Sequence, residues 1–211
     1  MKFNFFFFLL FVNVLQSQTL INAQFIVSDD LKENANSVVL NQEINVEIVS
    51  QDKIIIRKNK TILVYNELGL KNIDAIEFYD KSTKISSFEA SLYSSLGKKI
   101  KQFKDKDFND RSAADGFSIY NDSRVTSLDF TPTEYPFVIV FKSEIQSSNT
   151  AFIPSWYPID DFYESVVKSE ISISFPDNLG FKHKEINFQD KKIIKTETKN
   201  SISFLTENIP A

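Results

Sequence analysis

The sequence Phe137-Val138-Ile139-Val140-Phe141 is an unbroken apolar run that follows Pro136 and ends before Lys142. Its β-branched residues favour a strand rather than a helix, and the run has the length of a strand. Because apolar and polar residues do not alternate, both faces of this strand are expected to be buried. We therefore place residues 137–145 in the interior of a sheet.

Strand patterns recur on both sides of this run at short spacing. In residues 38–49, Ile44, Val46 and Ile48 alternate with polar residues, and Ser94-Ser95-Leu96-Gly97 is typical of a tight hairpin. The predicted strands are 38–49, 54–65, 73–79, 85–93, 98–103, 125–131, 137–145, 166–175, 181–188, 191–198 and 201–206. No segment keeps a helical spacing of apolar residues over about 12 residues. The sequence therefore predicts an all-β protein in which two antiparallel sheets pack as a sandwich.

Three segments lack a strand pattern. Residues 104–124 are rich in Asp, Asn and Ser and are predicted to form a long loop with at most one helical turn. Residues 146–164 are predicted to form a second long loop, and residues 24–37 an irregular N-terminal segment. Residues 38–211 are accordingly assigned to one β-sandwich domain.

The first 23 residues differ in composition from the remainder. Lys2 is their only charged residue, the apolar run Phe5-Phe6-Phe7-Phe8-Leu9-Leu10-Phe11-Val12 follows, and a polar stretch leads to Ala23. This order is typical of a secretory signal peptide. A spanning helix needs roughly 20 apolar residues, so no permanent membrane anchor is expected. We predict that residues 1–23 are removed and that the protein is exported to the periplasm, the cell surface or the medium.

The composition limits the chemistry. The 211 residues include no cysteine, one histidine (His183) and four glycines. Thiol nucleophiles and zinc–thiolate sites are excluded, and neither common glycine-rich phosphate-binding motif is present. Asp105, Asp107 and Asn109 alternate as in a calcium loop, but Asp110 replaces the turn glycine, so a solvated acidic loop is expected instead. The sequence therefore predicts no catalytic, cofactor-binding or metal-binding residues, and no enzyme activity.

The charge balance argues against nucleic acid as a partner. Of 24 Lys and Arg, Lys2 lies in the predicted signal peptide, so 23 basic residues face 28 acidic ones and the net charge is −5. The basic residues are interleaved with acidic ones rather than concentrated on one face, as binding to phosphates requires.

Two groups of residues are candidates for binding or positioning. Trp156, Tyr157, Phe162 and Tyr163 crowd into the loop 152–163 with Pro154 and Pro158. These rings either close the end of the core or anchor a partner or a sugar. Tyr120, Asp122 and Arg124 share one side of an extended chain. They are expected to fix their loop through an arginine–carboxylate pair, with a carboxylate-binding cleft as the alternative.

An ordered set of short segments resembles domain-of-unknown-function family 3857. The matching segments are Ala35-Asn36-Ser37-Val38-Val39-Leu40, Ala90-Ser91-Leu92-Tyr93, Gly97-Lys98-Lys99-Ile100-Lys101, Ser118-Ile119-Tyr120-Asn121-Asp122-Ser123-Arg124, Pro132-Thr133-Glu134-Tyr135-Pro136, Pro154-Ser155-Trp156 and Glu207-Asn208-Ile209-Pro210-Ala211. In secreted bacterial proteins, mostly of Bacteroidetes, this domain precedes a transglutaminase-like domain. The resemblance implies an immunoglobulin-like sandwich outside the cytoplasm and supplies no catalytic residues.

Two functional hypotheses follow from these observations. The first is a non-catalytic scaffold or interaction domain that contacts a transglutaminase-like domain or another protein. The alternative is a cell-surface module that binds a glycan or a peptide through the aromatic loop 152–163.

Overall fold

The fold of the chain was analysed in a computed structural model, which describes residues 27–113, 122–151, 153–186, 188 and 192–211. Strands make up 54% of the structure and helices 9%, so the predicted all-β class is confirmed. The predicted signal peptide, residues 1–23, lies outside the described residues. In the described part, no helix is long and apolar enough to span a bilayer.

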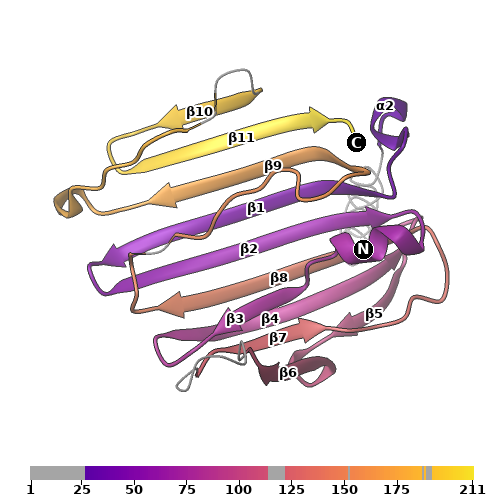
Figure 1. Ribbon diagram of the computed structural model, residues 1–211, viewed down its shortest axis with the longest axis horizontal. Helices are drawn as coiled ribbons and strands as arrows, with labels where there is room; N and C mark the ends of the chain where they lie inside the picture. Colours follow the sequence, from indigo (N-terminus) through magenta and orange to yellow (C-terminus); the bar gives the residue numbers. More distant parts are fainter. Residues whose placement is uncertain (1–26, 114–121, 152, 187, 189–191) are drawn as a thin grey trace, which may run out of the picture.

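Two sheets form the two layers of the structure (Figure 1). The large sheet has the order β10 (Ile193–Glu197), β11 (Ser201–Ile209), β9 (Glu164–Ser174), β1 (Ser37–Ser50), β2 (Lys53–Val64), β8 (Phe137–Ser147), β4 (Thr83–Ser94) and β5 (Lys99–Phe103). The small sheet has the order β3 (Ile76–Tyr79), β7 (Arg124–Leu128) and β6 (Phe108–Ser112). Neighbouring strands are antiparallel except β1 and β9, which run parallel.

The apolar run in β8 has the interior position that its sequence predicts. β8 lies between β2 and β4, and Phe137, Val138 and Ile139 are all buried. Because side chains alternate along a strand, Phe137 and Ile139 join a cluster on one face while Val138 joins a cluster on the other. Each face of β8 is thus covered, which explains why the run shows no alternation.

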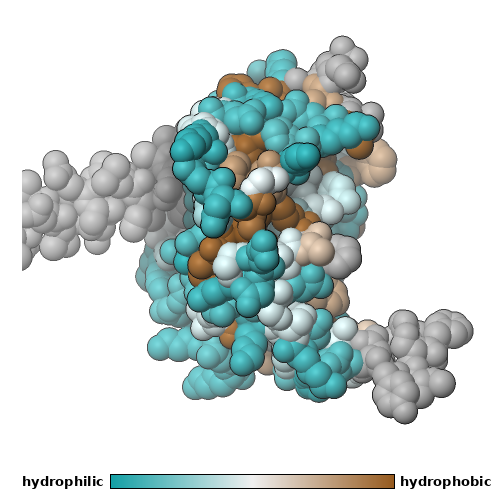
Figure 2. Space-filling view, turned by 90° about the vertical axis from the view of Figure 1, so that its left-hand side faces the viewer, coloured by the Kyte–Doolittle hydropathy of each residue, from teal (hydrophilic) through white to brown (hydrophobic). Residues whose placement is uncertain are grey.

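Three apolar clusters make up the core. The sandwich cluster lies between the small sheet and the β8–β4 half of the large sheet, and Phe108 packs there on Phe88 with 4.1 Å between ring centroids. The loop cluster occupies the same face of the large sheet farther along β1 and β2, beneath Trp156 and nearby loop residues. The helix cluster lies on the opposite face, where Leu31 of the short helix α2 (Asp29–Lys32) is buried. Seen from the end of the β1–β2 turn, apolar side chains form a central band between hydrophilic ones (Figure 2).

Four predictions about local structure were wrong. Strand β6 lies inside the predicted loop 104–124, because its sequence has one apolar anchor, Phe108, and its pairing with β7 supplies the rest. Residues 181–186 and 188, predicted to be a strand, form no strand, and Phe181 and Phe188 instead pack on the loop cluster. The N-terminal segment 24–37 contains α2, and the predicted strand 73–79 begins only at Ile76 because a 3₁₀ helix, η1 (Glu67–Asn72), precedes it.

Replacing Phe108 by alanine is expected to destabilise the protein by about 3–5 kcal/mol, because the ring anchors the small sheet in the core and its removal leaves a cavity. Urea unfolding followed by circular dichroism measures the change. Ile100→Ala is the control, since Ile100 lies exposed on the edge strand β5. A loss in Phe108→Ala no larger than in Ile100→Ala would show that the small sheet is held in another way.

Candidate functional site

Strand β2 carries two lysines on its inner face. Ile54, Ile56, Ile62 and Val64 point into the loop and sandwich clusters. Because side chains alternate with a period of two, Lys58 and Lys60 lie on the same face, between the two clusters. The inner face of the large sheet is therefore polar at its centre and apolar at both ends.

Each lysine is held by groups from outside the large sheet. The Lys60 ammonium is buried and donates to the carbonyl oxygen of Asn72 at 2.9 Å and to Asp74 Oδ2 at 3.1 Å. The Lys58 ammonium lies 2.9 Å from Glu77 Oε2, and Glu77 also accepts a 2.6 Å hydrogen bond from the Ser143 hydroxyl. These contacts fix η1 and β3 over β2 and β8.

Glu164 is a further ionisable group beside Lys60. It begins β9 and only 1% of its surface is exposed. Its Oε2 accepts a long 3.4 Å hydrogen bond from the backbone N–H of Asp160, and its buried Oε1 has no partner in the described part of the chain. Burial raises the pKa of Glu164 above its ordinary value of 4.5, the positive charge of Lys60 lowers it, and Asp74 and Asp160 raise it further.

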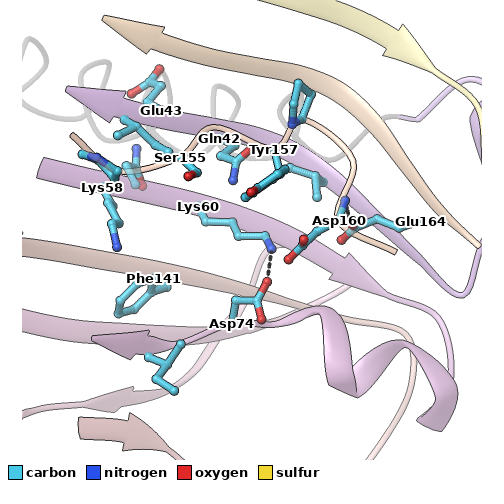
Figure 3. A pocket seen from close by; sticks show the side chains of 16 residues that line it. Gln42, Glu43, Lys58, Lys60, Asp74, Phe141, Ser155, Tyr157, Asp160 and Glu164 are labelled. Carbon is cyan, nitrogen blue, oxygen red and sulfur yellow. Dashed lines mark hydrogen bonds and ion pairs between the residues drawn. The ribbon is translucent and has the colours of Figure 1, made fainter. Parts of the chain in front are cut away.

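These groups line a pocket of about 190 Å³ between β1, β2, the residues before β3 and the loop 153–160. Asp74 and Asp160 lie on either side of the Lys60 ammonium, and Glu164 lies beyond Asp160 (Figure 3). Tyr157 and Ser155 form part of the wall contributed by the loop. Four apolar side chains, those of Val39, Ile44, Ile76 and Phe141, also line the pocket, as do Gln42, Glu43, Asn59, Pro154 and Pro158.

The pocket combines acidic and apolar surfaces. Of its four carboxylates, those of Asp74, Asp160 and Glu164 lie around Lys60 and are suited to accept hydrogen bonds from a positively charged group, and the fourth is that of Glu43. Among the described residues, no group of three or more carboxylate or histidine side chains is arranged to hold a metal ion. His183 lies elsewhere, beside Glu185 and Lys195.

The aromatic loop residues point in different directions. The Trp156 indole donates to the Ser169 hydroxyl at 2.9 Å and packs against the loop cluster. Tyr157 lines the pocket and is 61% exposed, whereas Phe162 and Tyr163 are 84% and 58% exposed. Phe152, at the start of the predicted loop, lies outside the described residues. The four candidate residues Trp156, Tyr157, Phe162 and Tyr163 thus do not form one surface.

The second predicted group, Tyr120, Asp122 and Arg124, is arranged differently from the expectation. Arg124 forms an arginine–carboxylate pair, but with Asp110 at 3.0 Å, and its Nε also donates to the hydroxyl of Tyr79 at 2.9 Å. Asp122 pairs with Lys81 at 3.2 Å. Tyr120 lies outside the described residues. Arg124 therefore links neighbouring strands of the small sheet on its exposed surface, because β3 and β6 both flank β7.

Sequence reasoning missed Lys60, Asp74 and Glu164 as site residues. The alternation of side chains along β2 is enough to predict that both lysines face inward. Ile54, Ile56, Ile62 and Val64 define the inner face, and Lys58 and Lys60 lie between them. No local pattern identified Asp74 or Glu164, whose position depends on long-range packing.

Comparison with known proteins identifies the family. Residues 50–211 match the family described as a domain of unknown function with a solved structure, DUF3857. The chain belongs to domain-of-unknown-function family 3857. This DUF3857 chain matches no curated protein.

A solved structure with a similar fold belongs to a longer protein. A crystal structure described as a "putative protease" from Parabacteroides distasonis superposes with a TM-score of 0.59 at 17% identity, over 83% of this chain and 36% of that one. An M1 zinc metallopeptidase from Deinococcus radiodurans gives a TM-score of only 0.32 at 8% identity, over 83% of this chain and 40% of that one. The DUF3857 chain thus spans about a third of the first protein, and the likeness concerns the fold alone.

Glu164→Gln is expected to stabilise the protein at neutral pH. Because the pKa of Glu164 is raised in the folded state, its contribution to stability is present below the unfolded pKa and is lost as the pH rises through the folded pKa. Every tenfold change in proton affinity between the folded and unfolded states corresponds to about 1.4 kcal/mol. Urea unfolding at a series of pH values should show a gain for the variant near pH 7 that disappears near pH 4.

Glu170→Gln is the matched control, since Glu170 lies on the same strand and pairs at the surface with Lys168. It should show no comparable gain at neutral pH. A Glu164→Gln protein that is less stable than wild type at neutral pH would mean that the carboxylate is ionised and well paired.

Proposed function

We propose that this DUF3857 chain is a non-catalytic interaction module of an exported protein, and that it holds a second protein domain at the end of the large sheet where β9 begins and β11 ends. The observation that carries the proposal is the exposure of Phe162 and Tyr163 at this end. Large rings with so much exposed area are costly in water and are enriched where proteins bind one another.

The loop that presents these rings is anchored on both sides. Asp161 forms an ion pair with Lys71, and its side chain also accepts a hydrogen bond from the backbone N–H of Phe162. The carbonyl oxygen of Tyr163 accepts a 2.7 Å hydrogen bond from the N–H of Asn36. A ring held on an ordered loop loses little conformational entropy on binding, which favours a docking role.

The course of the chain places these rings near the end of β11. Ile209 pairs with Val166, so β11 finishes beside the start of β9, and the C-terminus lies at this end of the sheet near α2 (Figure 1). A domain that follows β11 in the same polypeptide would emerge beside Phe162 and Tyr163. We propose a transglutaminase-like domain, as the sequence resemblance implies, or otherwise a separate protein, as the partner.

Other parts of the proposal rest on the sequence. Export is supported by the composition of residues 1–23. The immunoglobulin-like relationship is supported by the packing of two largely antiparallel sheets. The alternative function, binding of a glycan or peptide at the cell surface, is supported by the exposed ring of Tyr157 at the pocket wall.

Phe162→Ala is expected to weaken binding to the partner domain by about 2 kcal/mol, roughly 30-fold, if Phe162 is a hot spot. The melting temperature should stay nearly unchanged, because the ring buries little surface within the domain. Calorimetric titration of the purified protein with a transglutaminase-like domain from the same organism measures the affinity.

Leu96→Ala is the matched control, because Leu96 is also 84% exposed but lies in the β4–β5 turn, which β1, β2 and β8 separate from β9. It should leave the affinity unchanged. Equal affinities for wild type and Phe162→Ala would exclude this surface as the docking site, and a large fall in melting temperature would show that Phe162 belongs to the core.

A further inference from the structure

The pocket between β2 and the loop 153–160 contains a buried carboxyl oxygen without a hydrogen-bond donor. Glu164 is almost completely buried and lines the pocket, and its Oε1 has no partner among the described residues. Leaving a buried acceptor unpaired is costly, and more so when the group is ionised. Such a group in the wall of a pocket indicates that the missing donor belongs to a ligand.

The charges around the pocket favour a positively charged ligand. Four carboxylates line the pocket, those of Glu43, Asp74, Asp160 and Glu164, together with the two lysines Lys58 and Lys60; Asp74, Asp160 and Glu164 lie around the Lys60 ammonium. Two of the three N–H donors of Lys60 are engaged by Asn72 and Asp74. The charge of Lys58 is matched by Glu77, which does not line the pocket. Negative charge is therefore in excess, and the lysines already have partners.

The shape and lining of the pocket narrow the class of ligand. The volume of about 190 Å³ exceeds the roughly 150 Å³ of a cavity that holds benzene. Val39, Ile44, Ile76 and Phe141 provide an apolar surface for a short hydrocarbon arm. A primary ammonium supplies three N–H donors, and it needs no preformed coordination shell of the kind that a metal ion requires.

We propose that this pocket binds a primary ammonium group carried on a short aliphatic arm, as found in a lysyl side chain and at the N-terminus of a peptide. The ammonium donates to Glu164 and Asp160, and the arm lies against the apolar surface beside Tyr157. The ligand thereby supplies the partner that Glu164 lacks. This ligand class is independent of the docking role of Phe162 and Tyr163.

Two residues beside the pocket have uncommon backbone conformations that agree with this role. Asp74 has φ = 49° and Tyr163, which immediately precedes Glu164, has φ = 59°. Residues other than glycine seldom adopt this left-handed region, and such residues cluster at ligand-binding sites. Here the two residues fix the directions from which Asp74 and Glu164 enter the pocket.

Calorimetric titration of the purified protein with three small compounds tests the proposal. Nα-acetyl-lysine N-methylamide carries only a side-chain ammonium, leucine N-methylamide carries only an α-ammonium, and Nα-acetyl-norleucine N-methylamide has an arm without charge. We expect at least one ammonium compound to bind at least about tenfold more tightly than the uncharged one. Binding of the first compound alone identifies a lysyl side chain, and binding of the second alone identifies a peptide N-terminus.

Variants of the carboxylates complete the test. Glu164→Gln keeps the shape of the side chain and should weaken ammonium binding at least about tenfold, whereas Glu170→Gln should leave it unchanged. If Glu164→Gln does not fold, Asp160→Asn serves as the second variant and should also weaken binding. Equal binding of the charged and uncharged compounds, undiminished binding by the pocket variant, or no saturable binding at millimolar concentrations would overturn the proposal.

Discussion

The two lysines on the inner face of β2 constrain how the rest of the structure is assembled. An ammonium group placed between two apolar clusters must be paired, because an isolated buried charge is too costly. Lys58 takes its carboxylate from β3 and Lys60 takes its carboxylate from the residues just before β3. The small sheet is therefore fixed over β2 at one register. Glu77 adds to this by bonding Ser143 on β8, so that one carboxylate connects three strands.

Each of these ion pairs joins one buried side chain, Glu77 or Lys60, to a partly exposed one, Lys58 or Asp74, and we expect them to contribute more to specificity than to stability. Desolvation of the two charges cancels much of their attraction, so the net stabilisation is small. Sliding the small sheet along the large one would leave Lys58, Lys60 and Glu77 without partners. Leaving a buried polar group unpaired is costly, so these contacts favour the observed register. The apolar clusters then supply most of the stabilisation, and the ion pairs select the arrangement.

The loop over the other half of the sheet is positioned by a similar polar contact. The Trp156 indole donates to the Ser169 hydroxyl, which in turn donates to the side-chain oxygen of Gln42 at 2.6 Å. This chain of hydrogen bonds joins the loop to β9 and β1. With Trp156 fixed inward, the next residue, Tyr157, points outward along the pocket wall. The same constraint explains why neighbouring aromatic residues have different exposures.

The sequence predicted an element correctly where the residues of that one strand or turn are enough to define it. The unbroken apolar run of β8, the alternation in β1 and the turn at Ser94-Ser95-Leu96-Gly97 each identified their element, because a local pattern is enough to define a strand or a turn. β6 was missed because its strand conformation comes from pairing with β7 rather than from its own composition. The prediction of a strand over residues 181–188 was wrong for the opposite reason. The apolar residues of this segment cover the loop cluster without pairing with another strand.

The candidate site illustrates the same limit for function. The aromatic loop was found from its composition, but composition does not tell which ring faces inward. The inward position of Lys60 can be predicted from the alternation of side chains along β2. The groups around it cannot, because Asp74 and Glu164 come together there from distant parts of the chain. A fold shared with a longer protein does not supply this information either, because activity depends on particular residues rather than on topology. The function of this domain is therefore best sought in the groups that the fold leaves unsatisfied, and Glu164 is the buried carboxylate with an unpaired oxygen among the described residues.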